Sequence, residues 1–130
     1  MGADMASLAP TFTVTRDDAR REVHYALTGL FTIEAIDRFF EELRRVAGPF
    51  MEDRKGFRAI GDLRQYSVQP RDVAERMQMS QDISAKVGVT KMAIVYSSVL
   101  QMQQLRRVSN ALDMGYFTEM AEALDWLRKD

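Results

Sequence analysis

The chain has 130 residues, of which 46% are hydrophobic and 28% charged, and its formal net charge is -1. These values are typical of one soluble globular domain and exclude a disordered chain. Because its 18 basic and 19 acidic residues are interspersed, no global field favours nucleic acid or an anionic membrane as a partner. The sequence contains no cysteine, which excludes disulfides and thiolate metal sites, and we expect a cytoplasmic location.

The start of the chain shows neither a signal peptide nor a membrane span. Residues 1–10 have no hydrophobic period and end in Pro10, so we expect a loose lead-in there. Residues 11–130 contain no repeat, low-complexity tract or linker, and we expect them to form a single domain.

The first elements are a hairpin and a helix. Polar and apolar residues alternate over residues 11–15 and again over 22–28, with the turn-like Asp17-Asp18 between them. Thr32 is a candidate N-cap for a helix with an apolar stripe at helical spacing. Glycine and proline at Gly48-Pro49 predict its end.

The middle of the chain predicts a strand, a helix and a second strand. Residues 57–63 form an apolar run in which Gly61 indicates a close backbone approach or a bulge. Residues 70–87 form an amphipathic helix that begins at Pro70 and ends before Gly88. Its apolar residues follow two neighbouring tracks, one with Val73 and Met77 and the other with Met79, Ile83 and Val87. Residues 91–96 are apolar without alternation, which predicts a central, parallel strand buried on both faces.

The last third predicts two helices around a short strand. Ser97-Ser98 provides an N-cap for a third helix with Val99, Met102, Leu105, Val108 and Leu112. Residues 115–117 form a short strand, and Thr118 caps a final helix with Met120, Ala123, Leu124 and Leu127. Trp126 lies one residue off this apolar stripe and either covers the sheet edge or is partly exposed at a dimer contact.

The element order is therefore β-β-α-β-α-β-α-β-α. Strands two to five are each separated by one helix, which favours right-handed crossovers between parallel strands. The expected fold class is α/β, with a five-stranded, mixed and mostly parallel sheet flanked by four helices. The first strand should lie antiparallel at one edge.

Catalytic motifs are missing from the sequence. The only histidine is His24 in the hairpin, and no Gly-x-Ser-x-Gly elbow, Walker loop or dinucleotide fingerprint occurs. The carboxylate pairs Asp17-Asp18 and Glu41-Glu42 are typical of a turn and a solvated helix face rather than a metal site. We expect no enzyme activity, no cofactor and no bound metal, and an enzyme of unknown type is the third-ranked alternative.

Polar residues gather where two strands should end. In a parallel sheet these ends share one edge, at which ligands commonly bind. Helix N-termini there would favour a phosphate or carboxylate, assisted by Arg64 or Arg71. The alternative is that the serines simply cap helices and the Asp-Arg pairs lie on solvent-exposed loops without a ligand. Met77 and Met79 are either core filler or the lining of a groove. The candidate binding residues are Asp62, Arg64, Tyr66, Ser67, Arg71, Asp72, Met77, Ser97 and Ser98.

With these elements in place, the chain resembles the STAS fold, and more closely the small bacterial SpoIIAA-like proteins grouped with STAS and Sec14-type lipid-binding folds. The resemblance covers about Phe12 to Leu127. It rests on the element order, on Gly29-Leu-Phe-Thr, on Ala59-Ile-Gly-Asp-Leu and on the ending Tyr116-Phe-Thr-Glu-Met-Ala-Glu-Ala-Leu-Asp-Trp-Leu.

The resemblance implies a regulatory role, with one departure. Antagonists of that family carry a phosphorylatable hydroxyl in an Asp-Ser-Ser-Gly type segment. This chain has Ser67-Val-Gln-Pro-Arg-Asp in the matching region, without the Asp-Ser pair or the glycine. The resemblance therefore implies a docking surface without an evident phosphorylation switch.

Two functional hypotheses follow. The first is a non-enzymatic STAS-like regulatory or interaction module that docks a protein partner, or a second copy of itself, through helix two and the preceding loop. The second is a Sec14-like carrier of a lipid or other apolar anion. In the carrier, Met77, Met79 and Met102 would line a cavity and Arg64 or Arg71 would hold the head group.

Overall fold

The computed structural model describes residues 8–106 and 112–129. The strands are β1 (Thr11–Asp17), β2 (Glu22–Gly29), β3 (Phe57–Tyr66), β4 (Val89–Val95) and β5 (Asp113–Phe117). The helices are α1 (Ile33–Asp53), α2 (Arg71–Val87), α3 (Val99–Leu105) and α4 (Met120–Arg128).

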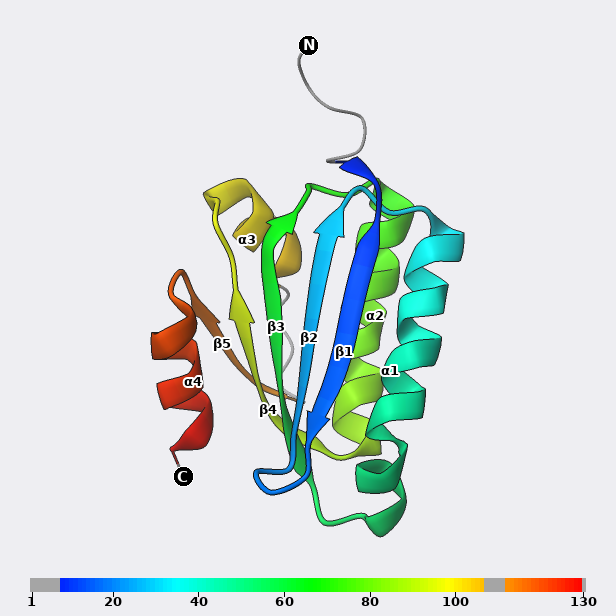
Figure 1. Ribbon diagram of the computed structural model, residues 1–130. Coiled ribbons are helices and arrows are strands. Elements are labelled where there is room, and N and C mark those ends of the chain that lie inside the picture. Colours follow the sequence, from blue (N-terminus) through cyan, green and yellow to red (C-terminus); the bar gives the residue numbers. More distant parts are fainter. Residues whose placement is uncertain (1–7, 107–111, 130) are drawn as a thin grey trace.

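The five strands form one sheet in the order β1-β2-β3-β4-β5 (Figure 1). β1 pairs antiparallel with β2, and every later neighbour pair is parallel. The expected mixed α/β sheet with an antiparallel first strand at the edge is confirmed. β3 is the middle strand, and β4 lies between β3 and β5.

Helices cover the two faces of the sheet unequally. α1 and α2 lie side by side on one face, whereas α4 covers the opposite face near β3, β4 and β5 (Figure 1). The larger apolar core lies on the α1–α2 side and includes Leu27, Phe39 and Leu63. The smaller core lies under α4 and joins Ile60, Ala93, Val95, Ala123 and Leu127.

Local signals explain several element ends. The Thr32 hydroxyl accepts a hydrogen bond of 3.1 Å from the Ala35 N–H at the start of α1. The Ser98 hydroxyl caps α3 in the same way, at 3.1 Å from the Gln101 N–H. α2 ends at Gly88, whose φ of 113° is a left-handed conformation that glycine adopts without strain.

The predicted end of the first helix at Gly48-Pro49 is wrong. α1 continues through Pro49 to Asp53 and ends at Arg54 in the left-handed conformation. Packing overrides the helix-breaking tendency of proline, because the extra turn buries Phe50 against the Phe57 ring at 5.6 Å between centroids.

Other boundaries also differ from the prediction. The third helix stops at Leu105, and Leu112 lies outside it, buried in the larger core. Val108 lies outside the described residues. Glu119, not Thr118, occupies the N-cap position of α4 and makes no side-chain cap bond. β1, β3 and β5 are longer than predicted, and β4 begins at Val89 and ends at Val95.

β3 contains an irregularity that matters for the site. Ala26 faces Asp62, but Thr28 faces Gln65, so β3 contributes one more residue than β2 over this interval. Such a bulge shifts the alternation of side chains between the two faces. Leu63 and, after the bulge, Tyr66 consequently both join the core on the α1–α2 side.

Candidate functional site

A cavity of about 450 Å³ lies between α1, α2 and the sheet. This volume falls within the range of small-molecule sites, about 300–1,000 Å³. The floor is formed by strand residues, including Tyr25, Ala59 and Met92. The apolar side chains contributed by the helices are Phe40, Leu43, Ala47, Met51, Met79, Ile83 and Val87.

α2 buries few of its side chains, although it has apolar residues on two tracks. Of the α2 residues only Val73 and Gln81 are buried. The track with Val73 and Met77 faces the core, whereas the track with Met79, Ile83 and Val87 lines the cavity. Two neighbouring apolar tracks on one helix were thus the sequence signal for this cavity.

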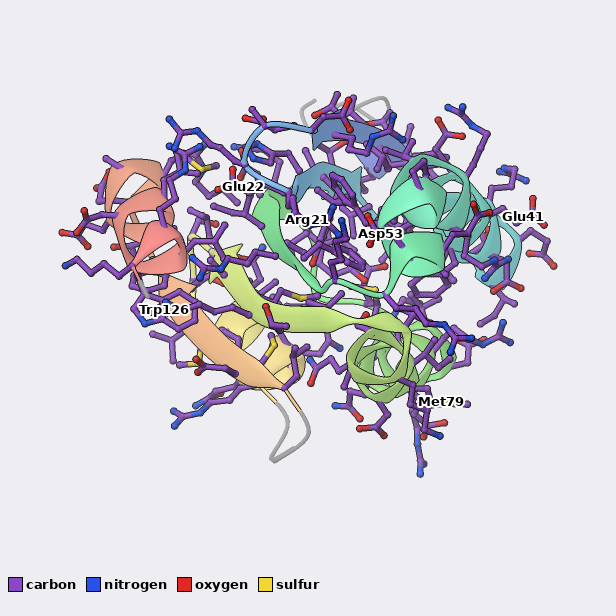
Figure 2. All side chains as sticks on the ribbon, turned by 90° about the horizontal axis from the view of Figure 1, so that it is seen from below. Arg21, Glu22, Glu41, Asp53, Met79 and Trp126 are labelled. Atoms are coloured by element: carbon purple, nitrogen blue, oxygen red, sulfur yellow. The ribbon has the colours of Figure 1, made fainter. Side chains whose placement is uncertain are left out.

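The mouth of the cavity combines apolar and charged side chains. Met79 and Ile83 are 55% and 56% exposed. The charged lining residues are Asp37, Glu41, Arg44 and Arg76, and Arg76 pairs with Asp37 across the two helices. Figure 2 shows Glu41 on α1 and Met79 on α2 at the outer side of these helices. Two acidic and two basic groups give the mouth no net charge.

A smaller space of about 40 Å³ adjoins the cavity on the side toward α3. Six residues line both spaces: Tyr25, Phe40, Leu43, Ser80, Ser84 and Met92. The inner space is also lined by Tyr66, Met77, Gln81 and Leu105. We call this smaller space the inner end of the cavity.

Two polar groups at the inner end have no hydrogen-bond partner among residues 8–106 and 112–129. They are the Tyr66 hydroxyl and the Gln81 Oε1 atom, and both residues are at least nine-tenths buried. The Gln81 Nε2 atom donates to the Leu105 carbonyl at 3.2 Å, which leaves the amide oxygen free. Burial raises the pKa of Tyr66, so its hydroxyl stays protonated and available as a donor.

Tyr25 forms part of the cavity floor and depends on Gly61. A Cβ atom at Gly61 would lie 2.4 Å from the Tyr25 ring, so only glycine lets the ring lie over β3. The Tyr25 hydroxyl donates to the Met92 Sδ atom at 3.5 Å, a weak bond. The close approach predicted from Gly61 is confirmed.

The predicted binding residues do not form one site. Ser97 and the end of β3 do meet, since the Ser97 hydroxyl donates to the Arg64 carbonyl at 2.7 Å. The two arginines expected to hold an anion are already paired, Arg64 with Asp62 at 2.8 Å and Arg71 with Glu75 at 2.9 Å. The Arg64 guanidinium accordingly holds the pKa of Asp62 below its usual value.

The remaining predicted residues have separate surroundings. Asp72 accepts a hydrogen bond from the Val73 N–H, and Ser98 caps α3. The Ser67 N–H donates to the Gly29 carbonyl. Tyr66 and Met77 instead line the inner end of the cavity, whereas Met102 is not among the residues that line either space.

Three glutamines, which the sequence did not single out, fix the loops at this edge of the sheet. The Gln69 side chain accepts from the Phe31 N–H at 2.8 Å and donates to the Gly29 carbonyl at 2.9 Å. Gln104 exchanges two hydrogen bonds with the Gln69 backbone. Gln101 donates to the Tyr66 carbonyl and accepts from the Ser97 N–H.

A buried carboxylate lies at the other end of the sheet, on the α4 side. Glu22 is 1% exposed, and its two oxygens accept from Arg128 at 3.0 and 3.1 Å. The only histidine, His24, contacts the same carboxylate at 2.8 Å. Burial opposes ionisation of Glu22, but the bonds from Arg128 and His24 outweigh it and lower the pKa.

Trp126 covers the sheet, the first of the two alternatives for this residue. Its ring packs on Phe117 at 5.5 Å between centroids and occupies the space where a Gly115 side chain would lie. The Lys91 ammonium lies 4.3 Å from the ring centroid.

Other kinds of site find no support within residues 8–106 and 112–129. No three potential metal ligands cluster there. None of the helices described combines the length and apolar character needed to cross a bilayer.

Comparison with solved structures supports the fold. The chain is similar to an uncharacterized protein of the DUF3478 family with a SpoIIAA-like fold from Shewanella loihica PV-4, at 17% identity and a TM-score of 0.67. The match covers 98% of each chain. No family model matches the sequence, and no curated protein matches it. The chain therefore has a SpoIIAA-like fold, as its resemblance implied.

Proposed function

We propose that this SpoIIAA-like domain is a non-enzymatic binding module that takes a small apolar molecule into the cavity between α1 and α2. The observation that carries the proposal is the cavity of about 450 Å³ with a mostly apolar lining from both helices and the sheet. Protein interiors are normally packed without voids of this size, so a persistent apolar space favours an occupant.

The proposal adopts the carrier hypothesis but changes the residues involved. Met79 lines the outer cavity and Met77 lines its inner end, as the carrier hypothesis expects for these two residues. The cations at the mouth are Arg44 and Arg76 rather than Arg64 and Arg71. Because Asp37 and Glu41 accompany them, the mouth has no net charge and does not select an anion.

Fluorescence of N-phenyl-1-naphthylamine, an uncharged apolar probe, tests this function. We expect saturable enhancement with the natural chain and weaker enhancement in the Ser84→Phe variant, because Ser84 lines both spaces and a phenyl ring there would obstruct them. Lys86→Phe is the matched control, since Lys86 is exposed on the same helix and outside both linings. Equal enhancement by both variants, or none by the natural chain, would reject the proposal.

A second candidate is protein docking at the carboxyl edge of the sheet. Val68, Val99 and Leu100 are 51%, 64% and 69% exposed on the loop before α2 and the first turn of α3. The glutamine bonds between these segments hold the patch in place, which suits a preformed interaction surface. Its occupant would be a second copy of this chain or another protein.

Sedimentation velocity over a concentration series tests the self-association form of this candidate. We expect a dimer that the combined Val99→Lys and Leu100→Lys variant returns to monomer. A monomer at all concentrations, together with an empty pull-down, would reject docking at this edge and leave the cavity proposal unaffected.

A further inference from the structure

We infer that the cavity selects an uncharged alcohol, an apolar chain whose terminal hydroxyl binds at the inner end between Tyr66 and Gln81. The inference rests on the proposed function and specifies its ligand class. It starts from the two buried polar atoms without partners, the Tyr66 hydroxyl and Gln81 Oε1.

The two unpartnered atoms offer complementary chemistry. A protonated tyrosine hydroxyl donates one hydrogen bond, and an amide oxygen only accepts. A ligand hydroxyl carries both complements, an oxygen that accepts a hydrogen bond, as from Tyr66, and a hydrogen that it donates, as to Gln81. Leaving a buried donor or acceptor unpaired costs about 1–3 kcal/mol, so a ligand that satisfies both gains affinity as well as orientation.

Competing polar groups at the inner end already have partners. The Gln104 amide bonds to the Gln69 backbone, and the Gln78 amide donates to the Gln104 carbonyl at 3.4 Å. The Ser80 hydroxyl donates to the Met77 carbonyl, and the Ser84 hydroxyl donates to the Ser80 carbonyl at 2.8 Å. The Tyr25 hydroxyl donates to Met92. Tyr66 and Gln81 are thus the polar groups of this lining that the ligand has to match.

A charged head group does not suit the inner end. Among the residues that the structure describes, its lining includes no aspartate, glutamate, lysine, arginine or histidine. An ion placed there would lose its hydration without gaining a counter-ion. The charged residues line only the mouth, where Asp37 already engages Arg76.

The shape of the cavity determines the orientation of the chain. Six residues line both the outer cavity and the inner end, so a chain with its hydroxyl at the inner end continues into the larger apolar space. A longer chain would reach Met79 and Ile83, whose exposed side chains extend the apolar surface at the mouth.

Competition against N-phenyl-1-naphthylamine tests the inference with three chains of equal length: octan-1-ol, 1-fluorooctane and octanoate, at about pH 8, where octanoate is ionised. We expect octan-1-ol to displace the probe at least threefold more tightly than 1-fluorooctane, the gain of about one hydrogen bond. Octanoate should be the weakest of the three.

The Tyr66→Phe variant should remove the preference for the alcohol and leave displacement by 1-fluorooctane unchanged. Its thermal stability should be equal to or higher than that of the natural chain, because the lost hydroxyl has no partner. Tyr116→Phe is the matched control. Tyr116 also buries an unpartnered hydroxyl, but it lines neither space, so the preference should persist.

The outcomes separate this inference from the proposed function. If the fluorescent probe does not bind, the proposed function fails and the inference fails with it. If the probe binds but the alcohol has no advantage, or Tyr66→Phe leaves the advantage intact, the inference alone fails, and a bound water is sufficient to serve the two polar atoms. Preferential binding of octanoate would also overturn the inference.

Discussion

Gly61 shapes the floor of the cavity because it leaves space for the Tyr25 ring. The Tyr25 ring lies where a side chain at position 61 would begin, with the nearest ring atom 2.4 Å from the place that a Cβ atom would occupy. Both residues are buried, so neither can relieve the conflict by moving into solvent. The shape of the cavity therefore depends on the absence of one methyl group.

We predict that Gly61→Ala pushes the Tyr25 ring into the cavity. Overpacking of this kind costs about 1–3 kcal/mol of folding free energy, and binding of N-phenyl-1-naphthylamine should weaken in parallel. Thermal unfolding and probe titration measure the two effects.

Gly48→Ala is the control for that substitution. A Cβ atom at Gly48 meets no atom within 4 Å, and alanine favours the helix, so stability should rise by up to about 1 kcal/mol with binding unchanged. Unimpaired binding and stability in Gly61→Ala would contradict the role assigned to Gly61.

Tyr66 illustrates what the sequence could not predict at the residue scale. Strict alternation along β3 places Tyr66 on the same face as Ile60 and Asp62, the face that α4 covers. The bulge turns Tyr66 to the opposite face. Gly61 indicated either a close approach or a bulge in this strand, but not the position of the extra residue or its effect on Tyr66. The Asp62 carboxylate accepts from the Arg64 N–H at 3.2 Å within this irregular stretch. Asp62 and Arg64, which the sequence suggested as binding residues, thus bond to each other within the irregular part of β3.

At the scale of elements, α4 is fixed to the sheet through its last turn. Arg128 joins the buried Glu22 carboxylate of β2, while Arg58 and Lys91 donate to the Leu127 and Trp126 carbonyls, respectively. Cations that meet a helix C-terminus also complement its dipole. The apolar stripe alone predicted that α4 packs on the sheet, but these polar anchors come from strands distant in sequence.

We predict that Glu22→Gln lowers the free energy of unfolding by about 3 kcal/mol near pH 7. This loss of stability lies at the lower end of the range for breaking a buried ion pair, because the Arg128 side chain is 33% exposed. The folded-state pKa of Glu22 is lowered from 4.5, so its stabilisation is present above that value and is lost as the pH falls through the folded-state pKa. The difference between the two proteins should therefore shrink below about pH 4.5.

Urea unfolding across this pH range measures the effect. Glu42→Gln serves as the control, because Glu42 also pairs with an arginine, Arg45, but on a helix surface where solvent screens the pair and its contribution is small. A Glu22→Gln protein that is no less stable than Glu42→Gln would contradict the anchoring role.

α2 is the element for which the sequence was most informative about function. Its two apolar tracks indicated more apolar surface than one packing face requires, and the second track lines the cavity. The same pattern did not reveal the space between α1 and α2. That space depends on how far the two helices stand apart, which tertiary packing determines.

At the scale of the whole molecule, element order was sufficient to predict the architecture. Alternating strands and helices leave few topologies once crossovers are right-handed and the hairpin precedes them. The predicted edge position of β1 and the parallel remainder of the sheet follow from that rule. The sequence directed attention to the carboxyl edge of the sheet, because polar residues gather at the strand ends, whereas the cavity of the proposed function lies between two helices and one face of the sheet.

The central claim is that an apolar ligand occupies this cavity, and methyl NMR of methionine-labelled protein tests it most directly. Met51, Met77, Met79 and Met92 line the cavity or its inner end, whereas Met120 packs in the smaller core under α4. Titration with octan-1-ol should shift the first four methyl signals in a saturable manner and leave the Met120 signal in place. Unchanged signals from the four cavity methionines, or equal shifts at all five, would contradict the claim.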